Sequence, residues 1–527
     1  MSPRQTNWSG VSVRRAALLL LPAALAGTLV LASPVTAQAA NTEPAQAPNA
    51  VPVPAATLTR VRVPGTSPMS ATAVDLSAAG YQAREFYAQG LANRYSGAEA
   101  SPTPRVDADT GNAVTTATVD RTASVLDGGH PYRTRVMVRY PKSKESFNGT
   151  LAVEWANVTV GVDFEFATAE SWKYLLDKGY AIAIVSAQRV GVERAKTWSP
   201  QRYGHLSVDV NTCNVTGTAE PAGTSLCTGD PLSFDIFAQV TKALKKNAGG
   251  ANAPMPGLKV KDTIAIGQSQ SASRLATYYN AIQPLHNLLD GFAFWDRSGQ
   301  LRSDVAVPAI SVNSEGLQAI LGGGSWTTSK FTRSWDLAGS SHASLYGAQY
   351  IDKISKRDQS ILQEFVSSPP DEPMTFFEWI NSPPAPCLYL PPFSTVRTGL
   401  VYDKAISSVR KWYRTGRPAA PSRRFEYTAS GQLARDVEGR VRGGIRLPQF
   451  LVPTAAQEAT NGAGFPCGVS GWHRYYTELE LKAMYGTHRR YVSEVRRVIR
   501  SRVAERYVLR SDARAAIRDA RQSNIAR

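Results

Sequence analysis

The segment TIAIGQSQSASRL, residues 263–275, decides the fold. It begins with β-branched and small apolar residues that are typical of a buried strand, and helix-like sequence resumes at Ser271. Between the two, GQSQS (residues 267–271) places a small residue two positions before and two positions after Ser269. A strand, a sharp turn with small neighbours and a helix are typical of a nucleophile elbow, which holds a serine hydroxyl at the edge of a parallel sheet. The segment therefore predicts Ser269 as a nucleophile.

Ser271 is a competing nucleophile in the same segment. It occupies the position where an elbow usually has its second glycine, and Ser273 follows it closely. A serine-rich helix N-terminus without chemistry would also produce this pattern, because serine favours N-cap positions. Ser269 is preferred because the expected strand ends immediately before Gly267.

The segments around this turn alternate between short apolar runs and helix-like stretches. Strands are expected at residues 151–155, 181–186, 263–266, 291–295, 306–312 and 334–338, and helices at residues 167–178, 234–246 and 271–282. Such alternation indicates a mostly parallel sheet with helices on both faces. Earlier strand-like runs at residues 58–63, 114–119 and 132–140 complete the pattern of an α/β-hydrolase fold.

Two stretches fall outside this rhythm and are expected to form a cap. One is the insertion at residues 188–259, and the other is the long extension that follows Ala343. We expect both near the carboxyl ends of the strands, where such sheets bind ligands. The expected organisation is a signal peptide (1–39), a flexible leader (40–56), an α/β-hydrolase core (57–425) and a C-terminal extension (426–527) whose basic helix packs on the core.

A serine nucleophile needs a histidine base that follows it in the chain and lies on a loop after the last strand. Of the six histidines, His342 meets this condition, because it follows the strand expected at residues 334–338. His286 lies too close to Ser269, at the end of the helix that leaves the turn. His473 and His488 lie in the C-terminal extension.

The acid of the triad is expected after a strand between the nucleophile and the base. Glu315 follows the strand that ends at residue 312 and is the first choice, and Asp296, after the preceding strand, is the alternative acid. Either carboxylate could instead only cap the following helix. The oxyanion hole is expected to use the N–H group of Gln270 and one near Asn157, after the strand at residues 151–155.

Composition and the N-terminus indicate an exported enzyme. The chain has 527 residues, 43% of them hydrophobic, which excludes a disordered chain. Arg4, Arg14 and Arg15 precede an apolar stretch and a small-residue site at residues 37–39, the pattern of a cleaved signal peptide. The apolar stretch is shorter than the roughly 20 residues that span a bilayer. We therefore expect a secreted, extracellular protein without an integral membrane segment after cleavage.

The four cysteines suit an oxidising compartment, where disulfides persist. The short spacing between Cys213 and Cys227 favours a bridge between these two, which leaves Cys387 to pair with Cys467. No metal-binding spacing of cysteines or histidines accompanies them, so we expect structural disulfides and no metal site.

The positive charge is concentrated at the C-terminus. The formal net charge is +17, and residues 487–527 contain twelve arginines against four acidic residues. Apolar residues recur there at helical spacing, so we expect a helix with a solvated basic face rather than a nucleic-acid-binding arm. Contact with an acidic cell envelope would suit such a face.

The chain resembles the bacterial α/β-hydrolase domain-containing family, whose substrates are largely uncharacterised. The shared segments are VEWANV (153–158), RYGHLS (202–207), DPLSFDIF (230–237), GQSQS (267–271), VNSE (312–315), WDLAGSSH (335–342) and GGIRLP (443–448). This resemblance implies an α/β-hydrolase fold with Ser269, Glu315 and His342 as triad. The chain departs from the family at Ser271, where glycine is usual.

These residues predict a secreted serine hydrolase that cleaves a carboxylic ester or lactone through an acyl-enzyme. The substrate would be a small-molecule or lipid-like ester, and the reaction needs no cofactor. Two alternatives remain, a peptidase or amidase that uses the same triad, and a non-catalytic envelope-binding protein with the same fold.

Overall fold

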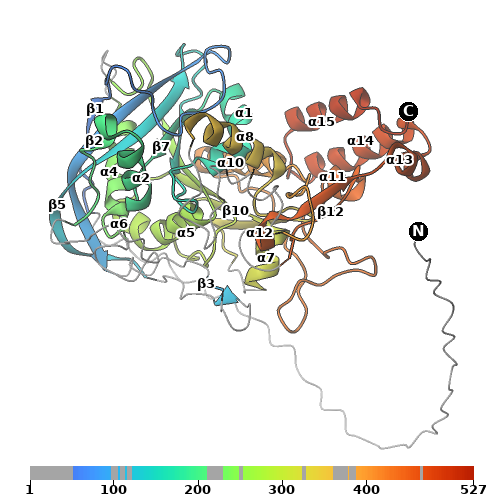
Figure 1. Cartoon of the computed structure of the whole chain (residues 1–527). Coiled ribbons are helices and arrows are strands. Elements are labelled where there is room, and N and C mark those ends of the chain that lie inside the picture. Colours follow the sequence, from blue (N-terminus) through green and yellow to red (C-terminus); the bar gives the residue numbers. More distant parts are fainter. Residues whose placement is uncertain are drawn as a thin grey trace, which may run out of the picture. The chain divides into compact units, whose positions relative to one another are not determined.

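A nine-stranded sheet organises the computed structural model of the chain (Figure 1). In spatial order its strands are β1 (Thr57–Arg60), β2 (Tyr81–Ser96), β5 (Ser124–Pro141), β7 (Ala181–Val185), β6 (Thr150–Trp155), β8 (Asp262–Gln268), β9 (Gly291–Trp295), β10 (Ala309–Ser314) and β11 (Thr332–Leu337). The strands from β7 to β11 run parallel to one another, whereas β1, β2 and β5 pair antiparallel with their neighbours. The chain is therefore a mostly parallel α/β protein with an antiparallel edge.

The structure describes most of the chain after the N-terminal segment. The described residues are 51–96, 105–106, 113–114, 121–210, 230–247, 253–322, 328–359, 375, 378, 387–462 and 467–527, all within the compact unit Gln46–Arg527. The expected signal peptide and most of the expected leader lie outside them.

Helices cover both faces of the sheet because its central strands are apolar on both sides. Strands β6 to β10 are buried at every position. On one face, α4 (Ser233–Lys246) and α5 (Gln270–Thr277) pack into a core with Val153, Ala265 and Phe292. On the other, α1 (Phe166–Asp177) and α10 (Gly399–Thr415) pack on Ile182, Ile264 and Ile310. The fully buried apolar strands thus account for the two-sided helix cover.

The remaining elements are shorter or lie at the margins of the sheet. They are β3 (Arg105–Val106), β4 (Ala113–Val114), α2 (Arg189–Trp198), α3 (Pro200–Tyr203), the π-helix η1 (Tyr278–Ile282), α6 (Gln283–His286), α7 (Glu315–Leu321), α8 (Leu345–Asp358), α11 (Pro448–Leu451), β12 (Ala455–Glu458), α12 (Cys467–Ser470), β13 (Trp472–Tyr475), α13 (Glu478–Tyr485), α14 (His488–Ala504) and α15 (Arg510–Gln522).

Part of the stretch expected as a cap belongs to the main core. Helix α4 lies within residues 188–259, yet its Phe237 ring stacks on Trp155 of β6 with the centroids 4.9 Å apart. Its apolar side is buried against the sheet, which a loop-rich cap would not require. Within the described part of this insertion, α2, α3 and their neighbours remain as material for a cap.

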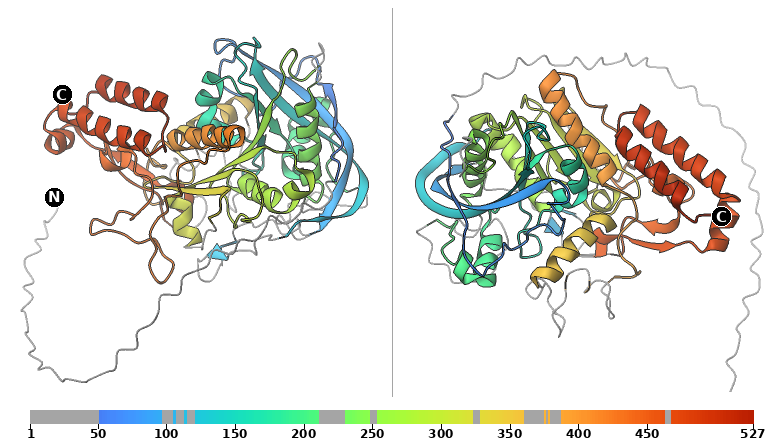
Figure 2. Two further views of the ribbon diagram at one scale, coloured as in Figure 1. Left: turned by 180° about the vertical axis from the view of Figure 1, so that it is seen from behind. Right: turned by 90° about the horizontal axis from the view of Figure 1, so that it is seen from above.

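The C-terminal helices combine a core of their own with a contact to the sheet core. Figure 2 shows α14 and α15 side by side, and Val492, Val495 and Val498 of α14 are buried in an apolar cluster there. Ile499 of α14 belongs instead to the sheet core. The arginines of α14 are mostly exposed. The basic helix therefore packs through one apolar face, as its periodicity indicated.

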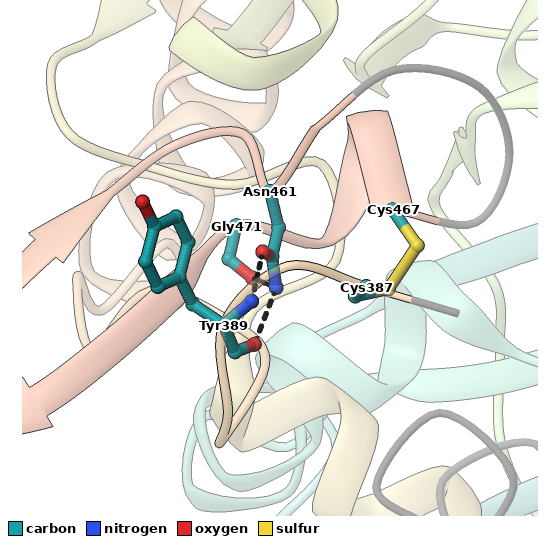
Figure 3. Close-up of a disulfide and its surroundings, with 5 residues drawn as sticks. All are labelled: Cys387, Tyr389, Asn461, Cys467 and Gly471. Carbon is teal, nitrogen blue, oxygen red and sulfur yellow. Dashed lines mark hydrogen bonds between the residues drawn. A yellow bond between two sulfur atoms is a disulfide. The ribbon is translucent and has the colours of Figure 1, made fainter. Parts of the chain in front are cut away.

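A disulfide joins Cys387 to Cys467, which are 80 residues apart in sequence (Figure 3). Beside it, the Asn461 side chain accepts a hydrogen bond from the Tyr389 N–H at 2.8 Å and donates one to the Tyr389 carbonyl at 2.7 Å. The bridge and the amide together fix the segment that begins at Cys387. The other expected pair, Cys213 and Cys227, lies outside the described residues.

Candidate active site

Ser269 occupies the turn between β8 and α5 in a conformation that L-residues rarely adopt. Its backbone angles are φ 59° and ψ −122°, and its side chain is partly buried. The Ser269 N–H donates to the Trp295 carbonyl at 2.9 Å, and the Ser269 carbonyl accepts the Ser273 N–H at 2.9 Å. Such strain persists only where surrounding contacts fix the backbone, and it is common at functional sites. The turn has the form that the sequence predicted for an elbow.

The neighbours of Ser269 explain why this turn needs small residues. A Cβ atom on Gly267 would lie 2.9 Å from Leu275 Cδ1 and 3.2 Å from the Ala272 nitrogen. Ser271 is fully buried, and its hydroxyl donates to the Gln268 carbonyl at 2.9 Å and accepts the Gln268 N–H at 3.2 Å. Ser271 therefore closes the turn with its side chain, whereas Ser269 carries the outward hydroxyl.

His342 lies on the loop after β11 and contacts the Ser269 hydroxyl. Its Nε2 atom is 2.7 Å from Ser269 Oγ. The carbonyl of His342 accepts hydrogen bonds from Trp295 Nε1 at 2.9 Å and from Gln268 Nε2 at 3.3 Å. These two donors hold the backbone of the loop that carries the imidazole.

Asp296 is the acid that the structure brings to the imidazole. Its Oδ2 atom lies 2.7 Å from His342 Nδ1, and its side chain is fully buried. The Ser314 N–H donates to Asp296 Oδ1 at 2.5 Å, and the Ser314 hydroxyl donates to Oδ2. Asp296 follows β9 directly and has a positive φ of 54°. Its carboxylate is thus held by two donors at the end of β10 and by the imidazole.

Glu315, the first choice for the acid, contacts Gly339 and Arg435 and not His342, so that prediction is wrong. Its Oε2 atom accepts the Gly339 N–H at 2.7 Å, and Oε1 pairs with Arg435 at 3.1 Å. Strand β10 continues to Ser314, two residues beyond the expected end, so Glu315 is the first residue of α7. The side chain that reaches the site from this strand end is therefore Ser314. Burial raises the pKa of Glu315.

Of the two expected oxyanion donors, only the Gln270 N–H lies where it could contact an oxyanion. Gln270 is the first residue of α5, where backbone N–H groups lack intrahelical acceptors. The Asn157 N–H, in contrast, donates to the Phe164 carbonyl at 2.8 Å and is not free for an oxyanion. The Asn157 side chain donates to the Gln268 carbonyl at 2.7 Å. Asn157 therefore stabilises the turn through its side chain, and its N–H group is not the second oxyanion donor.

A polar network beside the nucleophile was not predicted from the sequence. Gln270 Nε2 and Trp155 Nε1 both donate to Gln188 Oε1 at 2.9 Å. Gln188 in turn donates to Asp230 Oδ2 at 3.0 Å, and Arg274 pairs with the same atom at 3.5 Å. The network links the ends of β6 and β7 to α5. Its only sequence signal was DPLSFDIF, which begins with Asp230.

Neither a metal-binding cluster nor a membrane-spanning helix is found among the described residues. Among the described residues, no group of three or more histidine, cysteine, aspartate or glutamate side chains is arranged to hold a metal ion. None of the helices that the structure describes has the length and apolarity needed to cross a bilayer.

Several solved structures are similar to this chain over part of its length. "The structure of esterase Est22" matches with a TM-score of 0.22 and 12% identity, over 35% of this chain and 60% of that one. "Structure of esterase Est22 with p-nitrophenol" gives a TM-score of 0.24 and 11% identity over 45% and 65% of the two chains. An alpha-beta serine hydrolase homologue from Coxiella burnetii gives 0.24 and 10% identity over 44% and 92%. No curated protein matches.

The family comparison covers nearly all of the chain. The family model described as "Alpha/beta hydrolase domain" matches residues 46–518, from before β1 to within α15. This range includes the sheet, the strained turn at Ser269 and the loop that carries His342. The chain therefore belongs to this alpha/beta hydrolase family.

Proposed function

We propose that the protein is a serine hydrolase that cleaves a carboxylic ester through an acyl-enzyme. The observation that carries the proposal is the continuous chain from Ser269 Oγ through His342 to Asp296, with both contacts at 2.7 Å. A serine, a histidine and a buried carboxylate in this geometry form the arrangement that activates a hydroxyl for attack on a carbonyl.

The order of contacts assigns a role to each side chain. His342 Nε2 accepts the hydroxyl proton as Ser269 Oγ bonds to the carbonyl carbon, and the imidazolium later returns this proton to the leaving alcohol. Asp296 accepts the Nδ1–H, which fixes the imidazole tautomer and stabilises the imidazolium. A water molecule activated by His342 then releases the acid and restores Ser269. The Gln270 N–H faces the oxyanion, and such a donor contributes about 3 kcal/mol.

Leaving-group chemistry supports an ester, including a cyclic ester, over an amide. An alkoxide leaves more readily than an amide anion, so a triad needs less precise proton delivery to cleave an ester. The substrate class is a small-molecule or lipid-like ester.

We also propose that residues 1–39 direct export and that the enzyme acts outside the cell. The Cys387–Cys467 disulfide supports this location, because disulfides persist in oxidising compartments.

Matched ester and anilide substrates test the proposed function. Purified protein is assayed with p-nitrophenyl esters of short and long acyl groups and with p-nitroanilides of the same acids, with Ser269→Ala as the control. We expect hydrolysis of esters that falls to background in Ser269→Ala. Faster cleavage of the anilides would favour an amidase. No cleavage of either series would favour a non-catalytic protein and contradict the proposal.

A further inference from the structure

A strongly basic cavity of about 580 Å³ lies among α1, α10 and the connection between α14 and α15. Its charged lining residues are all cations, namely Lys178, Lys404, Arg410, Arg506, Arg510 and Arg514. The buried rings of Tyr174 and Tyr180 also contribute to the wall. A concave site with one sign of charge concentrates the field of its side chains and attracts ligands of the opposite sign.

This cavity is distinct from the candidate active site. Tyr180 immediately precedes β7, and Arg410 donates to Thr150 Oγ1, at the first residue of β6, at 2.7 Å. Both residues therefore mark the amino ends of parallel strands. Ser269 and Asp296, by contrast, follow the carboxyl ends of β8 and β9. The basic cavity therefore lies at the amino ends of the parallel strands, and the triad lies at their carboxyl ends.

A second cavity of about 230 Å³ shares Lys404 and Arg506 with the first. It adds two more cations, Lys411 and Arg417, and again no carboxylate lines it. We call these two cavities together the basic groove. Lys404 and Arg506 stand where the two parts meet, so a ligand with more than one anionic group could contact them from both sides.

Most cations of the groove lack an ion-pair partner, and Arg410, which lies 3.9 Å from Asp262, is an exception. Within the described part of the chain, Lys404, Arg506, Arg510 and Arg514 form no ion pair, although 29 ion pairs occur there. Burial and the nearby charges of Lys411 and Arg506 lower the pKa of Lys404. Like charges held this close destabilise the free protein, and an anion placed among them would relieve the repulsion.

Besides Asp262, two carboxylates lie near the groove. Asp177 pairs with Lys173 at 2.7 Å, and Asp512 accepts the Ser511 hydroxyl at 2.9 Å. Neither of them lines either cavity. The lining of the groove therefore contains no carboxylate, while Asp512 just outside it interacts with the charge of Lys178.

The N-terminus of α15 opens into the same cavity. Leu509, Arg510 and Ser511 line it, and the N-cap residue Leu509 supplies no side-chain hydrogen bond to the first turn. Backbone N–H groups in the first turn of a helix lack intrahelical acceptors and favour phosphate groups. The open helix end thus adds directed donors to the cations.

We propose that the basic groove binds a soluble ligand that carries several phosphate groups, with phosphates in both cavities. Arginine favours phosphate because its planar guanidinium donates two parallel hydrogen bonds, and the groove provides arginines on several sides. The ligand is small because the first cavity has the volume of a small-molecule site. A flat membrane would reach the exposed arginines but not Lys404, which is partly buried at the junction.

Titration with inorganic tripolyphosphate tests this proposal in the full protein. Calorimetry is carried out on the unchanged enzyme and on Lys404→Gln, Arg510→Gln and Arg497→Gln. Arg497 is the matched control, because it is an exposed cation of α14 that lines neither cavity and loses the same charge. We expect the Kd to rise about tenfold in each groove variant and to change less than about twofold in the control.

Several outcomes would overturn the proposal. They are an absence of tripolyphosphate binding, an equal loss of affinity in Arg497→Gln, and binding to phosphatidylglycerol vesicles that tripolyphosphate does not displace. The last result would indicate a membrane surface instead. The thermal midpoint of Lys404→Gln without ligand serves as a folding check, and we expect it to equal or exceed that of the unchanged protein. Binding should persist in Ser269→Ala, so the result does not depend on the proposed hydrolysis.

Discussion

His342 Nδ1 lies 2.7 Å from Asp296 Oδ2. This contact joins a loop after β11 to the residue that follows β9, across the intervening strand β10. Ser314, at the end of β10, donates to both oxygens of the same carboxylate and completes the link. The segments at the ends of three neighbouring strands therefore supply Asp296, its donor Ser314 and its partner His342.

The two acids make a direct comparison possible. Asp296→Asn should lower kcat/KM for an ester by about 10³–10⁴-fold, because the amide can hold the wrong imidazole tautomer and cannot stabilise the imidazolium. Glu315→Gln should change kcat/KM by less than about tenfold, because Glu315 contacts Gly339 and Arg435 instead of His342. Steady-state kinetics on both variants measures the difference. A larger loss in Glu315→Gln would restore Glu315 as the acid.

Ser271 should matter for stability and not for the chemical step. Ser271→Ala removes the hydroxyl that accepts the Gln268 N–H and that donates to the Gln268 carbonyl, which keeps only the Asn157 side chain as a side-chain donor. The free energy of unfolding should fall by about 1–3 kcal/mol, measured with urea, because buried polar groups lose their partner. Ester hydrolysis should persist in this variant. Loss of hydrolysis in folded Ser271→Ala, with retention in Ser269→Ala, would place the nucleophile at Ser271.

Glu170 should make stability depend on pH. This buried residue of α1 accepts the Ser344 hydroxyl at 2.9 Å, and burial raises its pKa from 4.5 to about 7. The unfolded chain releases the proton near pH 4.5, whereas the folded chain keeps it until about pH 7. The stability that this group contributes is thus fully present below pH 4.5 and is lost as the pH rises to about 7.

Glu170→Gln keeps an acceptor for Ser344 and removes the titration. Urea unfolding near pH 5 and near pH 8 should show that the unchanged protein loses stability relative to Glu170→Gln, on the order of a few kcal/mol. Parallel pH profiles of the two proteins would show that Glu170 does not titrate in this range.

The Cys387–Cys467 bridge should stabilise the protein measurably. It closes a long loop, since its cysteines are 80 residues apart, and constrains the unfolded chain accordingly. Replacing both cysteines with alanine should lower the free energy of unfolding by about 2–5 kcal/mol. Denaturation of the double variant beside the oxidised protein measures this loss. An unchanged free energy would mean that the bridge does not form.

The sequence was most informative where one local rule dominates. Most parallel strands could be predicted because they are short runs of apolar residues buried on both faces, and β9 was predicted with its observed bounds. The elbow was equally predictable, since the space at Gly267 is limited by Ser271, Ala272 and Leu275 of the same segment. Ser271 fits the turn through hydrogen bonds to Gln268, so the departure from glycine is compatible with the same geometry.

Predictions failed where several strands meet or where a strand lacks a simple pattern. Glu315 and Asp296 both follow strands, and only the observed end of β10 at Ser314 decides which carboxylate reaches His342. Asn157 follows β6 as expected, but the sequence does not reveal that its backbone pairs with Phe164. Strand β2 could not be predicted, because its 16 residues form neither a continuous apolar run nor a strict alternation of apolar and polar residues.

Covalent labelling of the nucleophile tests the central claim most directly. The protein is treated with a fluorophosphonate, digested and analysed by mass spectrometry to locate the phosphonylated serine, with Ser269→Ala as control. We expect an adduct on Ser269, loss of ester hydrolysis in proportion to labelling, and no adduct in Ser269→Ala. An adduct on Ser271, or no adduct while esters are still hydrolysed, would contradict it.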